Sequence, residues 1–412
     1  MLPTRIKKYL SLEFLVYLAV FLLPVYLIRL EPFGLPTNVL EILIGIIFIS
    51  HVGRAAMQKT RPLFPIKLGG YGKYAVLLGL MLGGIIISAV LNPGQLKGFG
   101  IIKGWFIIPI IFAYLSASIL KEKKKNIFLA YYLSAGAVAC ISLGYLIFSR
   151  LTYDGRLQVF FNSPNYLAMY LAPGIIAGIL FLSFLKHKNL PESEEKIEDA
   201  RLEEKKFKII FLAISLSIML IAIYKTYSYS AWLSILTSIS IVLLVKNKVF
   251  SKKMFIAAII LVLLFFSQLN NKKFRDLSSL DSRSSLSSRN MIWKSSALIL
   301  KDHWLLGIGP GNFQEAYLAN QKYFPSYLEW AVPHPHNIYL SLWLSGGIIA
   351  FLGFLGLVFF WLRDMFMKKK VTAIQLAAIG IMIYILLHGF FDTTYFKNDL
   401  AIVFWLNFLF II

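Results

Sequence analysis

"NIYLSLWLSGGIIAFLGFLGLVFFWL" (residues 337–362) is the stretch of this chain that decides its fold. It holds no charged side chain and is longer than the ~20 apolar residues that a helix needs to cross a bilayer. A backbone in lipid must satisfy its own hydrogen bonds, and a helix does so within one segment. The stretch therefore predicts a transmembrane helix and points to an all-α fold.

The rest of the chain has the same character. Of its 412 residues, 58% are hydrophobic and only 15% are charged, against about 45–50% and about 25% in a soluble domain. The composition excludes soluble, disordered and disulfide-rich secreted proteins. The single cysteine, Cys140, lies inside an apolar run, and we expect it to be a small buried hydrophobe.

Repeated apolar runs predict one polytopic membrane domain over residues 1–412, with about twelve transmembrane helices. They are continuous runs and not the alternating strands of a barrel. The expected spans lie near 10–28, 38–53, 74–91, 101–120, 126–148, 164–185, 208–224, 230–245, 253–268, 337–362, 371–390 and 399–412.

The basic residues indicate the topology. With the N-terminus inside, 27 of the 42 Lys and Arg fall in inside segments, and eight of the others lie in one long outer loop. This asymmetry places both termini in the cytoplasm. The net charge of +22 is then explained by topology and acidic lipids, and we expect no nucleic-acid partner.

The long outer loop, 269–336, is expected to have structure of its own. Its stretch "SSLSSRNMIWKSSALILKDHW" predicts an amphipathic helix near the outer membrane boundary. The following "GIGPGN" (307–312) is either a tight turn or a phosphate-binding loop, although it lacks the lysine of a P-loop. Both interpretations stay open.

Two histidines, His334 and His336, and Asn337 stand at the mouth of the span at 337–362. Histidine can accept a proton near neutral pH, and Asn337 can orient a sugar or cap the helix. The alternatives are histidines that are merely satisfied at an interface, or a zinc site, for which further ligands are lacking nearby.

Fixed cations also gather at the expected outer boundary, where they are costly and tend to be functional. An arginine fork can bind a phosphate with two hydrogen bonds, and the helix start at 162–165, which includes Asn165, offers backbone donors for an anion. The alternative for each cation is an ion pair or a snorkelling side chain. His388 and Asp392 share one helix face, which an ion pair or hydrogen bond at the helix end would explain. The cations are Arg289, Arg156, Lys103 and Lys225.

The cytoplasmic segments carry no P-loop, kinase or D-x-D motif. A reaction on the outer face must therefore use a donor that is already activated. Polyprenyl-pyrophosphate sugars are such donors, because their tails lie in the bilayer and their pyrophosphates lie at its boundary.

At this point the sequence resembles the O-antigen ligase and O-antigen polymerase superfamily of membrane glycosyltransferases. The dense motif runs over 287–347, from "SSRNMIWKSSALILKDHWLLGIGPGNF" to "HPHNIYLSLWLSGG". Weaker similarity lies in "GRLQVFFNSPNYLA" (155–168) and "HGFFD" (388–392). One departure is Tyr229 in "TYSYSAWL", where the family often has an arginine that helps to hold pyrophosphate; Lys225 or Arg156 could supply that charge.

The resemblance implies a class C glycosyltransferase fold in the cytoplasmic (inner) membrane, with its active site on the extracytoplasmic face. It implies a glycan donor on polyprenyl pyrophosphate, an acceptor hydroxyl on a lipid-linked or envelope glycan, inversion of the anomeric centre, and no metal or cofactor. His336 would be the general base and Arg289 would bind the pyrophosphate. Supporting substrate ligands would be Arg156, Lys225, His334, Asn337, Tyr229 and Asn165.

Three functions remain open at this stage. A ligase would attach a finished glycan, whereas a polymerase would extend repeat units; we favour the ligase. A transporter or flippase also commonly has twelve spans, but it usually places its site near the bilayer midplane. A non-catalytic scaffold of an envelope assembly complex is the third possibility.

Overall fold

The computed structural model describes residues 11–32, 36–57, 72–187, 195–247, 266–267, 285–324 and 331–411. The structure is 79% helical. The described part of the chain has one two-stranded antiparallel sheet, formed by β1 (Arg29–Leu30) and β2 (Thr37–Asn38). The chain divides into two compact units. Unit 1 comprises Met1–Lys124, Asn270–Lys368 and Ile385–Ile412, and unit 2 comprises Lys125–Leu269 and Lys369–Tyr384.

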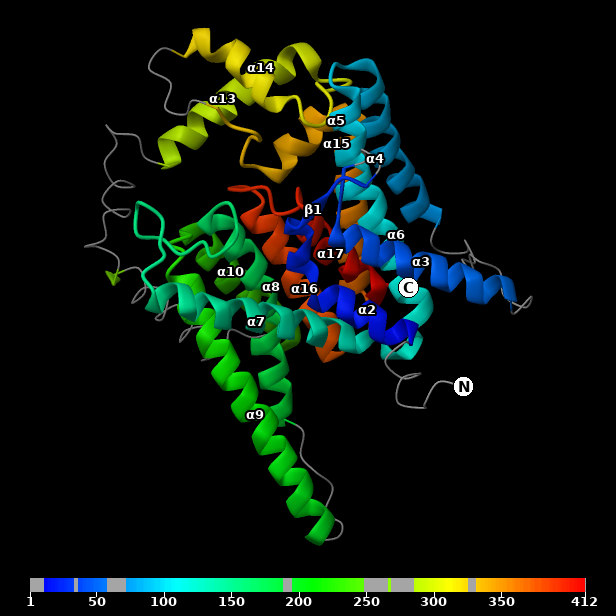
Figure 1. Ribbon diagram of the computed structural model, residues 1–412, viewed down its shortest axis with the longest axis vertical. Helices are drawn as coiled ribbons and strands as arrows, with labels where there is room; N and C mark the ends of the chain where they lie inside the picture. Colours follow the sequence, from blue (N-terminus) through cyan, green and yellow to red (C-terminus); the bar gives the residue numbers. More distant parts are fainter. Residues whose placement is uncertain are drawn as a thin grey trace. The chain divides into compact units, whose positions relative to one another are not determined.

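Unit 1 holds the N-terminal helices, the helices between residues 285 and 323, and the C-terminal helices (Figure 1). Their order along the chain is α2 (Leu12–Phe21), η1 (Leu23–Leu27), α3 (Val39–Met57), α4 (Gly72–Leu91), α5 (Gln95–Ile101), η3 (Ile102–Ile107), α6 (Ile108–Leu120), α13 (Ser285–His303), α14 (Phe313–Asn320), η5 (Gln321–Tyr323), α15 (Ile338–Phe366), α17 (Asn398–Leu406) and η6 (Asn407–Phe410). The element η3 is a π-helix, a local widening that often occurs at functional sites.

Unit 2 is built around α7, α8 and α9, which pack against one another, with α10 against α8. Gly178 lets α8 approach α7 closely, because a Cβ there would lie 2.5 Å from Cε2 of Tyr132. The last turn of α16, from Ile385, belongs to unit 1. The elements are α7 (Ile127–Ile147), α8 (Pro164–His187), α9 (Glu195–Tyr224), α10 (Tyr229–Asn247) and α16 (Ala373–His388), and η4 (Lys121–Asn126) precedes α7.

Within the described residues, six helical segments are long and apolar enough to cross a membrane. They are Val39–Met57, Gly72–Leu91, Gln95–Ile147, Pro164–Leu182, Glu203–Tyr224 and Ile338–Phe366. Shorter apolar helices are Leu12–Phe21, Tyr229–Val245, Ala373–His388 and Asn398–Phe410. These helices point to a membrane protein. The expected span at 253–268 lies almost entirely outside the described residues, so the number of twelve stays a prediction.

Glycines determine how α15 packs against α4 in unit 1. A Cβ on Gly84 would lie 2.8 Å from the Gly346 oxygen, and a Cβ on Gly353 would lie 2.6 Å from the Met81 nitrogen. In lipid, helices associate by close packing of small residues, since no hydrophobic force drives them together. The α4 helix therefore gives α15 a fixed position.

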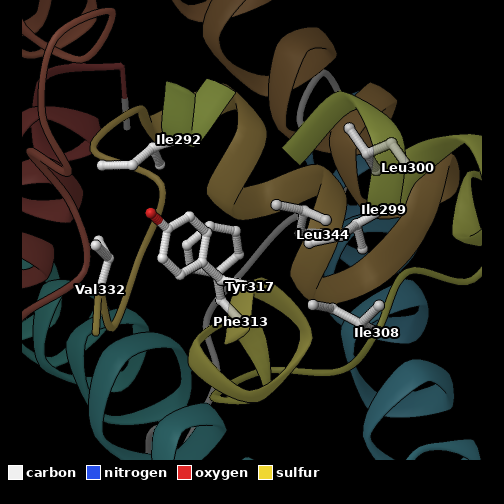
Figure 2. Packing of buried hydrophobic residues seen from close by; sticks show 8 residues of the cluster. All are labelled: Ile292, Ile299, Leu300, Ile308, Phe313, Tyr317, Val332 and Leu344. Atoms are coloured by element: carbon white, nitrogen blue, oxygen red, sulfur yellow. The ribbon is translucent and has the colours of Figure 1, made fainter. Parts of the chain in front are cut away.

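An apolar cluster joins α13, α14 and the start of α15 into one layer. Figure 2 shows the rings of Phe313 and Tyr317 at its centre, with centroids 5.9 Å apart. The full cluster consists of Ile292, Ile299, Leu300, Ile308, Phe313, Tyr317, Val332 and Leu344. The helices α13 and α14 thus share an apolar core with the start of α15.

The environment of Cys140 differs from the expected one. It lies on α7 and is exposed, so the prediction that it is buried is wrong. An apolar run in a membrane helix does not distinguish the side that faces protein from the side that faces lipid. The physical reason is that lipid and a protein core favour the same side chains.

Candidate active site

Asn337 fixes the start of α15. Its side-chain oxygen accepts hydrogen bonds from the backbone nitrogens of Tyr339 and Leu340, at 2.9 and 3.0 Å, as a helix N-cap does. Its amide nitrogen donates to the Phe390 carbonyl at 3.1 Å. Both ends of this side chain are therefore used, and they tie the start of α15 to the segment that follows α16.

His336 precedes that cap and has a left-handed backbone, with φ of 48°, which is uncommon for a residue other than glycine. Its Nδ1 lies 3.1 Å from Oδ1 of Asp392. The imidazole side chain is 29% exposed, whereas the Asp392 side chain is only 2% exposed. The strained backbone thus presents a ring that contacts a buried carboxylate on one side and remains accessible on another.

Arg289 reaches the same carboxylate from α13. Its Nη2 lies 3.8 Å from Oδ2 of Asp392, and its Nε donates to the Phe391 carbonyl at 2.9 Å. A carboxylate that is buried needs partners of this kind, because an isolated buried charge is very costly. The imidazole and the guanidinium therefore flank Asp392.

This environment controls the ionisation of Asp392. Burial by itself raises the pKa of the carboxyl, but His336, Arg289 and His334 together hold the pKa of Asp392 well below its usual value. The carboxylate is then ionised at neutral pH and can only accept hydrogen bonds. Nδ1 of His336 must donate to it, which leaves the lone pair of a neutral imidazole on Nε2.

His334 lies beside this pair. Its ring centroid is 4.6 Å from that of His336, with the rings nearly perpendicular. Burial, followed by the charge of His336, lowers the pKa of His334 to about 3, so this ring is neutral at neutral pH. The charge of Lys397 also lowers the pKa of His334. Lys397 precedes α17, and the sequence pattern did not indicate it as a site residue.

Asp392 belongs to the site, although the sequence pattern indicated only a helix-end pair with His388. Its spacing from His388 suggested a helix-end pair, and the Asp392 nitrogen does donate to the His388 carbonyl at 3.0 Å. The carboxylate, however, contacts residues 56 and 103 positions away along the chain, His336 and Arg289. Local spacing cannot reveal contacts over such distances.

The "GIGPGN" segment forms a turn against a break in α15. Gly347 has a φ of 69° inside α15, and a Cβ there would collide with the Leu305 carbonyl. Gly307 has a φ of 72°, and its Cβ would collide with the Leu344 carbonyl. The Ile308 nitrogen donates to that same carbonyl at 2.7 Å. These glycines serve close packing between the turn and the helix.

The other predicted site residues lie in unit 2. Arg156, which is buried, donates from Nε to the Thr226 carbonyl and from Nη2 to Oδ1 of Asn165, both at 2.7 Å. Its Nη1 lies 3.9 Å from Oδ2 of Asp154. Three sides of the guanidinium are thus in contact with protein oxygens, which matches the ion-pair alternative.

Lys225 and Tyr229 lie close to Arg156 within unit 2. The Lys225 carbonyl accepts a hydrogen bond from the Leu157 nitrogen at 2.9 Å. The guanidinium charge of Arg156 acts on the Tyr229 hydroxyl, and the Tyr229 ring meets Trp232 edge to face at 5.3 Å. The structure therefore groups Arg156, Asn165, Lys225 and Tyr229 in unit 2, and His334, His336, Asn337 and Arg289 in unit 1.

A metal centre finds no support in the described part of the chain, where no group of three or more His, Cys, Asp and Glu side chains could hold an ion. The zinc alternative for His334 and His336 therefore lacks a ligand set among these residues.

Part of the chain matches a known protein family. Residues 214–355 match the family model described as O-antigen ligase. This match supports the O-antigen ligase superfamily. The matched segment includes Arg289, His334, His336 and Asn337, and ends before Asp392. The superfamily implies glycosyltransferase-like activity and a place in polysaccharide biosynthesis. A search of curated proteins found no match.

Proposed function

We propose that the protein is a membrane glycosyltransferase that moves a glycan from a polyprenyl-pyrophosphate donor to a sugar hydroxyl. The reaction would take place on the extracytoplasmic face of the cytoplasmic membrane. The observation that carries this proposal is the buried Asp392 carboxylate between His336 and Arg289. It joins a proton acceptor to an anion-binding side chain, and two of the three residues lie in the segment that matches the family.

The tautomer of His336 determines where the proton of the acceptor hydroxyl goes. Asp392 accepts a hydrogen bond from Nδ1 of His336, and the Nε2 lone pair then takes the proton of the acceptor hydroxyl. The freed oxygen attacks the anomeric carbon of the donor and forms the new glycosidic bond from the opposite face, which inverts that centre. A positioned general base of this kind contributes about 10²–10⁴-fold to the rate.

The leaving group departs in the same reaction. The bond between the anomeric carbon and the pyrophosphate oxygen breaks, and its electron pair goes to the pyrophosphate. Arg289 would stabilise that charge, because a guanidinium donates several hydrogen bonds to phosphate oxygens. Its pairing with Asp392 at 3.8 Å is long enough to leave donor capacity for a substrate.

The remaining predicted ligands form the second part of the proposal. His334 would support His336 as a neutral ring, and Asn337 would hold the start of α15 in register. Lys225, Tyr229 and Asn165 stay predicted substrate ligands, as does Arg156, whose contacts within unit 2 favour a structural role. The class C fold, which the family resemblance implies, and about twelve transmembrane helices stay predictions. Cytoplasmic termini stay a prediction that rests on the distribution of basic residues.

A transfer assay tests the function. The purified protein in lipid is incubated with labelled glycan on polyprenyl pyrophosphate and with a panel of lipid-linked and free glycan acceptors. We expect label to move onto an acceptor. A single shifted product would indicate a ligase, and a ladder would indicate a polymerase of the same superfamily. Bound donor without transfer to any acceptor would contradict the proposal and favour a transporter.

A further inference from the structure

A pocket of about 240 Å³ lies in unit 1 beside the site, and His334 belongs to both. Three aromatic residues, Trp105, Phe313 and Phe396, line it, and so do Lys97, Gln314 and His334. It brings together η3, the "GIGPGN" turn, the start of α14 and residues 333–335. The pocket is smaller than the roughly 300–1,000 Å³ of sites for drug-sized ligands, so it suits a single ring.

The walls of the pocket are held in place by packing. The rings of Trp105 and Phe396 meet edge to face, with centroids 5.8 Å apart, and Phe313 stacks on Tyr317 in the apolar cluster (Figure 2). The alkyl chain of Lys97 passes so close to Gly311 that a Cβ there would lie 3.0 Å from Lys97 Cε. The aromatic walls are therefore in place before a ligand arrives.

His334 connects this pocket to the reacting groups. It lines the pocket, and its ring centroid lies 4.6 Å from that of His336. A ring seated in the pocket therefore lies next to the proposed general base. Arg289, which would hold the pyrophosphate, does not line it.

We propose that this pocket binds one sugar ring of the acceptor glycan and selects the acceptor; the inference rests on the proposed function. A pyranose has apolar C–H faces, which match Trp105 and Phe396, and hydroxyl edges, which match the Gln314 amide and the Lys97 ammonium. A prenyl chain would leave these polar groups without hydrogen-bond partners on its side, at a cost in free energy. Among the described residues, Lys97 forms no salt bridge, so an acidic sugar would add an ion pair.

Steady-state kinetics test the assignment in the full-length protein in lipid. We expect Gln314→Ala and Lys97→Ala each to raise the KM for the acceptor glycan by up to about tenfold, the size of one lost hydrogen bond, and to leave the KM for the donor unchanged. The matched controls are Glu315→Ala and Lys301→Ala, two exposed neighbours outside the pocket. An increase confined to the donor KM, or no change in either KM, would overturn the proposal.

A binding experiment separates this inference from the proposed activity. In a Cys140→Ala background, Gln314→Cys places one thiol at the pocket, and its rate of modification by a maleimide is measured. We expect methyl glycosides of neutral and acidic hexoses to slow the reaction, and polyprenyl phosphate not to. Protection by polyprenyl phosphate alone, or by no sugar, would overturn the assignment. Protection by sugars in a protein that transfers no glycan would remove the proposed function and leave the sugar site.

Discussion

Two arginines, each close to the predicted outer boundary, have different environments. Arg156 in unit 2 is buried against a carbonyl, an amide oxygen and a more distant carboxylate. Arg289 in unit 1 donates to the carbonyls of Phe391 and Ser285, and it also contacts a buried carboxylate that it shares with a histidine. The first arrangement holds two loops together, and the second assembles groups that can exchange a proton and bind an anion.

The comparison teaches that a cation near a membrane boundary is a weak indication of a substrate site until its partners are known. By residue type and by position near the predicted boundary, both side chains are candidate phosphate ligands. In the structure, the His336–Asp392 pair beside Arg289 separates them. The predictions below test that separation.

The largest effect is expected for His336→Ala. Removing the base should lower the transfer rate by about 10²–10⁴-fold while donor binding persists. The rate is measured with saturating donor, and binding is measured separately with labelled donor. His303→Ala, an exposed histidine at the end of α13, is the control and should transfer at the normal rate. Normal transfer by His336→Ala would show that the base lies elsewhere.

Asp392→Asn should lower the transfer rate by about 10²-fold or more, although it keeps the shape of the side chain. An amide can donate to Nδ1 as well as accept from it, so the proton of His336 is no longer held on the side away from the substrate. The same rate assay applies, with thermal unfolding to confirm that the variant folds. A rate within threefold of normal would limit Asp392 to a structural role.

The two arginines should respond differently to replacement by lysine. Arg289→Lys should raise the KM for the donor by about tenfold, because lysine cannot reproduce a two-pronged contact with phosphate. Arg156→Lys should mainly lower the free energy of unfolding, by about 1–3 kcal/mol, because Thr226 and Asn165 lose a buried partner. Melting temperature and donor KM are measured for both variants. Identical responses would remove the distinction between the two regions.

The smallest effect concerns stability at acid pH. The pKa of His334 is lowered in the fold to about 3 from its ordinary value of 6.5, so the unfolded state binds the extra proton. Stability from the neutral ring is complete above about pH 6.5 and declines as the pH falls towards about 3. We expect His334→Gln to lose less melting temperature than the normal protein between about pH 7 and about pH 5. His303→Gln should leave that loss unchanged; equal losses in all three proteins would contradict the assignment.

The local features of the site could be predicted from the sequence. The apolar stretch at 337–362 forms most of α15 (Ile338–Phe366), and Asn337 caps it, as its chemistry and position suggested. The serine-led segment of the outer loop forms α13, with Arg289 on it. These features depend on neighbouring residues, and the pattern of a short segment contains that information.

The features that depend on tertiary packing could not be predicted in the same way. No feature of the sequence near His336 indicates Asp392, because α15 and α16 lie between the two residues. The break of α15 at Gly347 depends on the approach of the Leu305 carbonyl, and the pocket depends on η3 meeting the "GIGPGN" turn. Such contacts require the arrangement of whole helices, which hydropathy and charge leave undetermined.

The central claim is that His336 and Asp392 act as one unit in proton transfer. A double-mutant cycle tests it most directly, with single-turnover transfer rates for His336→Ala, Asp392→Ala and the double variant, each with donor already bound. If the carboxylate acts through the imidazole, the double variant should transfer about as fast as His336→Ala alone. If the two losses multiply, the residues act independently and the account of the site is wrong.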